Sequence, residues 1–169
     1  MAGVVWGRAG IGSVMGLFLG THINKVDRKG RVSVPAQFRA ALADQAFAGI
    51  ILYPSPVHEA VIVGCGMGFL ERMAAASSNS FDVFSDEQDD LGAAIFGSAV
   101  QLPWDPEGRV GLPEHLLAHA GIGEQVAFVG KGVQFQLWQP EAHKIHEAEA
   151  KTRIKLNKPK LILRNPEGT

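Results

Sequence analysis

Apolar residues alternate with polar ones or cluster in short runs along most of the chain, which is the pattern of a protein rich in short β-strands. Val32 and Val34 flank the polar Ser33, as expected for a half-buried strand. The continuous apolar runs at 50–53 and 126–129 predict strands buried on both faces. Further segments that predict strands lie at residues 23–26, 60–63 and 133–138.

Two short helices are predicted, and each is introduced by a proline. Pro35 and Pro113 follow predicted strands, and proline is favoured at the first position of a helix because its missing N–H would have no partner there. Phe38 and Leu42 then share one face of the first helix. Gly121 is placed to end the second helix, since glycine readily adopts the left-handed conformation of a helix end.

Longer helices are predicted in two regions. Residues 65–95 have helical spacing of apolar side chains, and we expect the polar run 77–80 to divide them into two helices. The second of these helices starts with acidic residues, which the positive end of a helix favours. Residues 140–150 predict a helix that begins at Pro140. Residues 151–169 have no clear capping residues, so we expect a frayed or disordered end.

The chain contains an internal repeat with a constant offset of 78 residues. Residues 26–35 read VDRKGRVSVP, and residues 104–113 read WDPEGRVGLP. A unit of about fifty residues is too small to bury a full core alone. We therefore expect the two copies to share strands in a pseudo-twofold arrangement. The identical positions are Asp27 and Asp105, Gly30 and Gly108, Arg31 and Arg109, Val32 and Val110, and Pro35 and Pro113.

Each copy contains a turn whose residues have predictable roles. Asp27 and Asp105 stand at the first position of a type I turn, where a carboxylate can accept hydrogen bonds from the backbone. Gly30 and Gly108 stand at the fourth position, where a positive φ is expected. We interpret these four residues as structural. The arginine that follows each turn lies four residues after the aspartate and could pair with it.

The net charge of −1 conceals two basic segments. Residues 17–40 carry five basic side chains and one acidic one, a net of +4, whereas residues 41–95 carry one basic and eight acidic ones, a net of −7. Residues 151–169 carry six basic side chains and one acidic one, a net of +5. Binding responds to the local field, so the total charge does not exclude nucleic acid as a partner.

The first turn is the predicted DNA contact. Its arginines and lysine are spaced to meet phosphates, and a two-stranded ribbon can enter the major groove, where arginine contacts guanine. A solvated turn is the alternative interpretation of the same charges. In the second turn Pro106 and Glu107 replace two of the cations, so its arginine is expected to contribute less. The expected DNA-binding residues are Lys25, Arg28, Lys29, Arg31 and Arg39, with Arg109 as a weaker contributor.

These motifs resemble a known family. Residues 18–20, 27–35 and 38–39 resemble the opening of MraZ proteins, and residues 105–113 with 137–138 resemble the second half of that family. The resemblance covers roughly residues 17–150. The two Asp-x-x-x-Arg blocks also resemble those of the SpoVT-AbrB swapped-hairpin superfamily. Residues 1–16 and 151–169 lie outside the pattern, so the resemblance implies nothing about them.

The resemblance implies a fold and a function. The implied fold is α+β and rich in strands, a pseudo-twofold swapped-hairpin β-barrel with flanking helices. The implied protein is cytoplasmic and nucleoid-associated, forms ring-shaped homo-oligomers and needs no cofactor. It would bind repeated sites in double-stranded promoter DNA upstream of its own division and cell-wall gene cluster and repress transcription, without catalysis and without a membrane partner.

These observations divide the chain into five parts. Residues 1–16 are expected to be a flexible extension, 65–95 a helical connector, and 140–169 a C-terminal helix with a basic tail. The two SpoVT-AbrB-like repeats are placed at residues 17–64 and 96–139.

Two other classes of function compete with DNA binding. A non-DNA-binding oligomeric scaffold could use the same duplicated barrel for assembly alone. A metal-dependent hydrolase could use His115 and His119, which are four residues apart, but a third ligand at a convincing spacing is missing from the sequence. His143 and His146 are interpreted as surface histidines, and Cys65 as a small buried residue.

Overall fold

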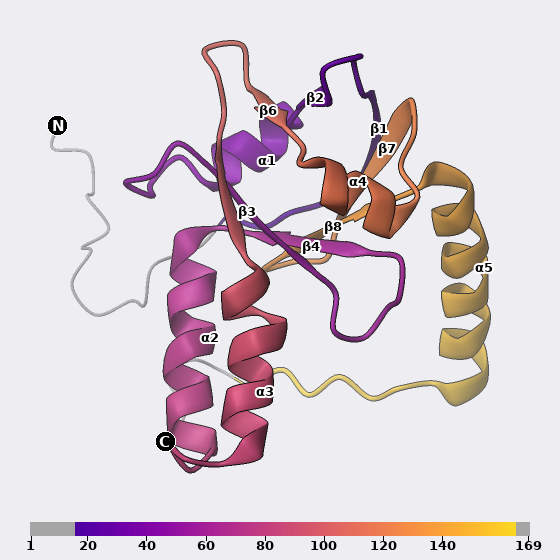
Figure 1. The fold of residues 1–169 in the computed structure, drawn as a ribbon. Helices are drawn as coiled ribbons and strands as arrows, with labels where there is room; N and C mark the ends of the chain where they lie inside the picture. Colours follow the sequence, from indigo (N-terminus) through magenta and orange to yellow (C-terminus); the bar gives the residue numbers. More distant parts are fainter. Residues whose placement is uncertain (1–15, 165–169) are drawn as a thin grey trace, which may run out of the picture.

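Six antiparallel strands form one sheet, and two further strands form a short ladder beside it (Figure 1). The computed structural model describes residues 16–164. The fold is α+β, as the sequence predicts. In chain order the strands are β1 (Thr21–Lys25), β2 (Arg31–Ser33), β3 (Gly49–Pro54), β4 (Ile62–Cys65), β5 (Val100–Pro103), β6 (Arg109–Gly111), β7 (Gln125–Gly130) and β8 (Phe135–Trp138). The helices are α1 (Ala36–Ala41), α2 (Met67–Ser80), α3 (Asp86–Ala94), α4 (Glu114–Ala120) and α5 (Pro140–Asn157), with a 3-10 turn, η1 (Phe96–Ser98).

Strands from the first half of the chain pair with strands from the second half. β1 pairs with β7, and β5 pairs with β3, so the first strand of each half joins the other half. β4 and β8 pair in the middle of the sheet, whose order is β1-β7-β8-β4-β3-β5. β2 pairs with β6 in the separate ladder. The sheet ends at β1 and β5, so no closed barrel forms among the described strands.

The ladder of β2 and β6 contributes to the largest buried cluster of the chain. Val32 pairs with Val110 across the ladder, and each side chain is 1 % exposed. Phe38 of α1 and Leu116 of α4 occupy equivalent positions of the repeat, and both are fully buried in this cluster. The ring of Phe38 lies 5.2 Å from that of Phe135 in β8. Burial of each such side chain contributes about 1.5–3 kcal/mol, so both halves stabilise one common core.

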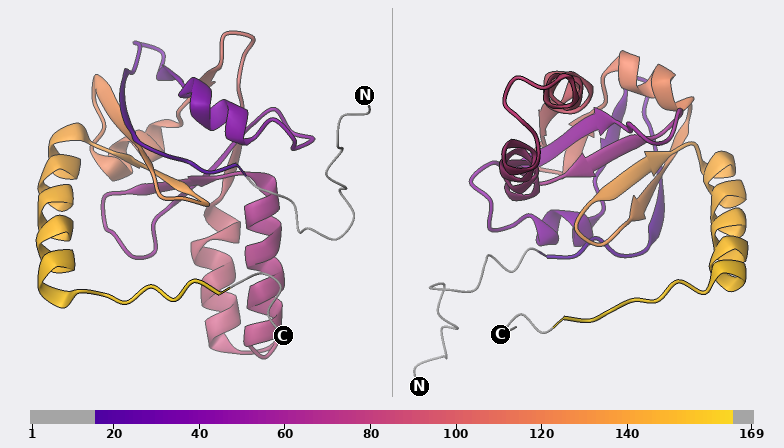
Figure 2. Two further views of the ribbon diagram at one scale, coloured as in Figure 1. Left: turned by 180° about the vertical axis from the view of Figure 1, so that it is seen from behind. Right: turned by 90° about the horizontal axis from the view of Figure 1, so that it is seen from below.

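The two turns and the helical connector lie at opposite ends of the molecule. The connections from β1 to β2 and from β5 to β6 lie together at one end (Figure 1). α2 and α3 extend side by side from the other end, while α5 lies along a different side of the sheet (Figure 2). None of the helices described for this chain combines the length and apolarity needed to cross a bilayer.

The predicted strands and short helices are confirmed, with small shifts at their ends. Each apolar segment expected to form a strand overlaps an observed one. Pro35 and Pro113 precede the first helical residue instead of occupying it, because their ψ values of 136° and 141° keep them extended. Gly121 ends α4 with a φ of 62°, as predicted.

The connector forms two helices, as predicted, but residues 77–80 do not break the first one, because α2 continues to Ser80. The Oγ of Ser77 donates a hydrogen bond to Oε1 of Gln88 in α3 at 2.9 Å, and the Oγ of Ser78 donates to the carbonyl oxygen of Ala74 at 3.1 Å. Serine hydroxyls that already have these partners do not compete with the helical backbone.

The prediction of a frayed end after residue 150 is wrong for residues 151–157, which continue α5. Ion pairs one helical turn apart support this extension: Glu147 to Lys151 at 2.6 Å and Glu149 to Arg153 at 3.8 Å. Residues 158–164 have no regular secondary structure. The expectation of a flexible extension at 1–16 falls, apart from Gly16, outside the described residues, as do residues 165–169.

Rings gathered around Trp138 attach α5 to the sheet. His146 stacks on Trp138, with 4.6 Å between ring centroids and 27° between ring planes. His143 meets the same indole edge-on at 5.6 Å, and His58 from the β3–β4 connection lies 5.1 Å from His146. The expectation that His143 is a surface residue is wrong, since docking of the helix leaves it only 5 % exposed.

We predict that acidification weakens the docking of α5. Burial lowers the pKa of both His143 and His146, and the positive charge of Lys131 lowers both further. The docked state therefore favours neutral imidazole. Its stabilisation is fully present above the ordinary histidine pKa of about 6.5 and is lost as the pH falls through the lowered values. Replacing His146→Phe keeps a ring on Trp138 but removes one titrating group, so this variant should lose less thermal stability than the parent between about pH 7 and pH 5.

The control is His115→Phe, which removes an exposed histidine of α4 and should keep the pH dependence of the parent. Thermal melts across this pH range measure the effect. The explanation fails if His146→Phe and the parent lose stability in parallel.

Candidate nucleic-acid interface

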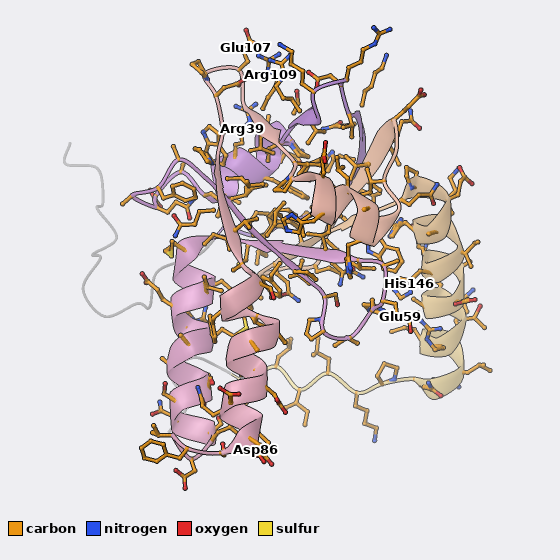
Figure 3. All side chains as sticks on the ribbon, in the orientation of Figure 1. Arg39, Glu59, Asp86, Glu107, Arg109 and His146 are labelled. Atoms are coloured by element: carbon orange, nitrogen blue, oxygen red, sulfur yellow. The ribbon has the colours of Figure 1, made fainter. Side chains whose placement is uncertain are left out.

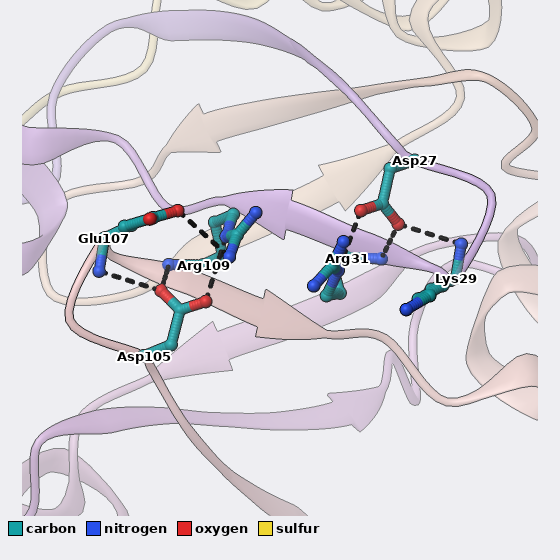
Figure 4. A network of polar contacts seen from close by, with 6 residues as sticks. All are labelled: Asp27, Lys29, Arg31, Asp105, Glu107 and Arg109. Atoms are coloured by element: carbon teal, nitrogen blue, oxygen red, sulfur yellow. Dashed lines mark hydrogen bonds and ion pairs between the residues drawn. The ribbon is translucent and has the colours of Figure 1, made fainter.

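Hydrogen bonds to an aspartate organise the first turn, between β1 and β2 (Figure 4). Oδ1 of Asp27 accepts hydrogen bonds from the backbone N–H of Lys29 at 2.9 Å and of Arg31 at 2.8 Å. Oδ2 of Asp27 accepts from Nε of Arg31 at 2.8 Å. The hydrogen bond from the Arg31 backbone is the largest influence on the pKa of Asp27, which is held below its ordinary value. The carboxylate therefore stays ionised and braces the turn.

The second turn, between β5 and β6, has the same geometry. Oδ1 of Asp105 accepts from the backbone N–H groups of Glu107 and Arg109, both at 2.9 Å, and Oδ2 accepts from Nε of Arg109 at 2.9 Å. The pKa of Asp105 is lowered, chiefly by the backbone hydrogen bond of Arg109. The predicted pairing of aspartate and arginine is thus present in both turns.

The glycine of each turn connects that turn to the other half of the chain. Gly30 and Gly108 have φ values of 79° and 78°, which confirms the predicted left-handed positions. The carbonyl oxygen of Gly108 accepts a hydrogen bond from the N–H of Val34 at 2.9 Å, and that of Gly30 accepts from Leu112 at 2.8 Å. Both turns are therefore held beside one another by the β2–β6 ladder.

The two arginines differ in how many of their side-chain nitrogens are paired with a carboxylate. Nη2 of Arg109 pairs with Oε2 of Glu107 at 3.0 Å, in addition to the Nε contact with Asp105. In residues 16–164, Arg31 is paired only through Nε, with Asp27. The side chain of Arg31 is 39 % exposed, and its terminal amino groups have no hydrogen-bond or ion-pair partner among residues 16–164. A carboxylate already occupies one of the corresponding groups in the second turn.

Arg39 lies against the second turn and not beside the first. A Cβ added to Gly108 would meet Cζ of Arg39 at 2.5 Å, so the guanidinium covers this glycine. Nε of Arg39 donates to the carbonyl oxygen of Val34 at 3.2 Å. At the equivalent position of the repeat, Leu117 packs near Gly30, with Cδ1 3.7 Å from a Cβ added there. The repeat offset shows from the sequence that Arg39 and Leu117 are equivalent positions. Only the fold shows that each of them contacts the turn glycine of the other half.

The remaining candidate cations surround the first turn. Lys25 ends β1, and Arg28 and Lys29 lie in the turn itself, all three with exposed side chains. With Asp27 and Arg31 the first turn has a net charge of +3. The second turn balances Arg109 and Arg39 against Asp105 and Glu107. Figure 3 shows Arg39, Glu107 and Arg109 at the same end of the molecule, far from Asp86.

The histidines and the cysteine that suggested other chemistry do not gather into a metal site among the described residues. In the described part of the chain, no three histidine, cysteine or acidic residues gather in a way that could hold a metal ion. Cys65 is fully buried, as predicted, and burial raises the pKa of its thiol to about 12. A thiol in this state is a poor nucleophile at neutral pH.

Comparisons with known proteins identify the family. A family model described as "MraZ protein, putative antitoxin-like" matches residues 17–65 and 95–164. The chain belongs to the MraZ family. A protein of Rickettsia bellii named transcriptional regulator MraZ is 47% identical over 152 residues, which is 89% of this chain and 99% of that protein. Its namesake in Rickettsia peacockii is 48% identical over 127 residues, 75% of this chain and 84% of that protein.

The residues matched by the MraZ family model include both turns and the whole six-stranded sheet. It omits residues 66–94, which contain α2 and α3. It also extends to residue 164, beyond the end of α5. MraZ proteins are a family of transcriptional regulators and not of enzymes.

We predict that the backbone hydrogen bonds of Asp27, more than its ion pair, hold the first turn. Asp27→Asn retains an oxygen that can accept from the two N–H groups but loses the charge, whereas Asp27→Ala loses both. The alanine variant should melt several degrees below the parent, and the asparagine variant between the two. Asp44→Ala, which removes an exposed carboxylate outside both turns, is the control and should melt like the parent. If the asparagine and alanine variants melt together, the backbone contacts are not the main role of this carboxylate.

Proposed function

We propose that this chain is a sequence-specific transcriptional regulator that binds double-stranded promoter DNA through its first turn. The observation that carries the proposal is the free end of Arg31. Its Nε is fixed by Asp27 at 2.8 Å, while its terminal amino groups have no protein partner among residues 16–164. An arginine held at its base and free at its tip is suited to a bidentate contact with guanine.

The neighbouring cations would supply most of the affinity. Lys25, Arg28 and Lys29 are exposed around Arg31 and can neutralise phosphates on either side of a groove. The second turn would act mainly by positioning, because Glu107 would repel phosphate and occupies part of Arg109. Arg39 adds one positive charge there, so a single phosphate contact is expected from that side.

The finer description of the fold belongs to the same proposal. We interpret the exchange of β1 and β5 between the halves as a pair of swapped hairpins of the SpoVT-AbrB type. The shared offset of 78 residues and the reciprocal hydrogen bonds of Gly30 and Gly108 support this interpretation.

Assembly into a ring-shaped homo-oligomer completes the proposal. One turn offers only a few contacts, and several identical turns on one assembly would gain effective concentration on repeated sites. The MraZ relationship supports a cytoplasmic, nucleoid-associated protein that represses its own division and cell-wall gene cluster. A scaffold that does not bind DNA would retain the assembly and lack the DNA contact.

We predict that Arg31→Ala reduces specific DNA affinity by about 10-fold to 100-fold, the effect of losing one bidentate base contact, while leaving the fold intact. Arg28→Ala and Lys29→Ala should each lower the slope of affinity against salt concentration by about one unit. Arg109→Ala should affect thermal stability more than DNA affinity, because Arg109 is paired with two carboxylates. Titrations of a labelled upstream duplex at several salt concentrations, together with thermal melts, measure both effects.

Arg39→Leu is the matched variant for the second turn. Leucine already occupies the equivalent position, 117, so the packing should survive while one phosphate contact and about one unit of salt slope are lost. If Arg109→Ala melts like the parent but binds DNA as poorly as Arg31→Ala does, the two turns contribute equally to DNA affinity and this part of the proposal is wrong. If the parent shows no salt-dependent affinity for the duplex, the scaffold is the better description.

We also predict that DNA sites act together. Repeats spaced by about one helical turn, roughly 10 base pairs, should be bound by several turns of one assembly at once. Inserting half a helical turn between two repeats should reduce affinity, whereas inserting a full turn should largely restore it. Equal affinity for all three spacings would rule out simultaneous binding by a rigid assembly.

A further inference from the structure

The end of the α2–α3 hairpin exposes apolar side chains among acidic ones. The exposed fraction is 71 % for Val83 and 95 % for Phe84. A hollow on the outer side of α3 is lined by both residues together with Asp86, Asp89, Gly92 and Ala93. Gly92 faces open space, since nothing lies within 4 Å of a Cβ added there. The acidic side chains of this hairpin end are Asp82, Asp86, Glu87, Asp89 and Asp90.

The hairpin carries one basic residue, Arg72, in the first half of α2 and away from the acidic hairpin end. No lysine or arginine occurs between Arg72 and Arg109. Figure 3 shows Asp86 at the far end of the hairpin, remote from the arginines of the two turns. A patch that joins exposed apolar side chains with one sign of charge fits a partner that is apolar and of the opposite charge.

Residues 158–164, the tail segment, have that complementary composition. Their sequence is KPKLILR, with three cations and no acid. Leu161, Ile162 and Leu163 are 86 %, 76 % and 86 % exposed. In an extended chain Leu161 and Leu163 would lie on one face, and the cations Lys158, Lys160 and Arg164 on the other. Such a segment can place leucines in an apolar hollow while its cations meet acidic rims.

We propose that the hairpin end of one copy binds the tail segment of a second copy of this chain. The tail segment and the hairpin end are both exposed in a single chain, so neither covers the other. The tail segment begins at the end of α5, which lies on a different side of the sheet from α2 and α3, and runs back across the molecule (Figure 2). When the hairpin end of one copy binds the tail segment of another, the first copy still has a free tail segment and the second a free hairpin end. Further copies can bind there, and repetition of the contact closes a ring or extends a filament. This proposal rests on the self-association included in the proposed function, and it specifies which two surfaces of the chain are in contact.

Reversal of charge on each surface tests the contact. The hairpin variant carries Asp86→Lys and Asp89→Lys, and the tail variant carries Lys158→Glu and Lys160→Glu. Light scattering on the full chain without DNA gives the molar mass at a series of concentrations. We expect the parent to exceed the 18.1 kDa of a single chain and each variant to dissociate at a concentration at least about tenfold higher than the parent does.

An equimolar mixture of the two variants should reassemble, because the reversed surfaces are again opposite in charge. A contact made within one chain cannot be restored by adding another chain. A parent that has the mass of a single chain overturns the proposal. So does a mixture that stays dissociated although circular dichroism shows both variants folded.

Apolar variants avoid the effect of lysine at the start of a helix. Phe84→Ser and the double variant Leu161→Ser, Leu163→Ser change side chains that are at least 86 % exposed, so the fold should survive. Each should weaken assembly as the charge variants do. Val57→Ser, at a side chain 80 % exposed in the β3–β4 connection, is the control and should keep the parental mass. Parental mass in both apolar variants also overturns the proposal.

A short duplex with one binding site separates this contact from DNA binding. The assembly variants should bind that duplex like the parent, whereas Arg31→Ala should bind it about 10-fold to 100-fold more weakly and keep its mass. If no chain binds DNA but the masses respond as described, the regulator function fails and the contact stands. If DNA binding behaves as described while every assembly variant keeps the molar mass of the parent, the proposed hairpin–tail contact is wrong and the regulator function stands.

Discussion

The reciprocal attachment of each turn to the opposite half is the constraint on which the structure depends. Val34 donates to Gly108 and Leu112 donates to Gly30, and between these bonds the valines of β2 and β6 face the common core. Both glycines that accept these hydrogen bonds have positive φ, near 78°. The aspartates fix that backbone shape from inside each turn. The positions of Arg31 and Arg109 follow from this arrangement, because each arginine pairs with the aspartate of its own turn.

Much of the fold was predictable because its signals are local. Apolar alternation identified β2, continuous apolar runs identified β3 and β7, and the repeated Asp-x-x-Gly-Arg blocks identified both turns and their ion pairs. The errors occur where a contact with another helix or strand decides the outcome. The serine run stays helical because Gln88 accepts from Ser77, and His143 is buried because Trp138 lies beneath it. Neither partner can be identified from spacing.

The candidate site shows the same limit. The sequence identifies Arg31, Arg109 and the aspartates that hold them, since each pair lies within one turn. It does not reveal that Arg39 covers Gly108, because that contact crosses between the two halves. It also leaves open whether Glu107 merely adds negative charge or pairs with Arg109. The 3.0 Å contact between them decides this, and it is the feature that makes the two turns chemically unequal.

The exchange between halves has a consequence for how such a protein can evolve. In a dimer of identical chains, symmetry would place the same side chain over both turn glycines. Joining the two copies in one polypeptide removes that restriction, so Arg39 can cover one glycine while Leu117 lies beside the other. A substitution in the helix of one half therefore alters the turn of the other half. The halves must diverge as a coupled pair, and their joining in one chain lets two turns of the same backbone geometry differ in their side-chain contacts.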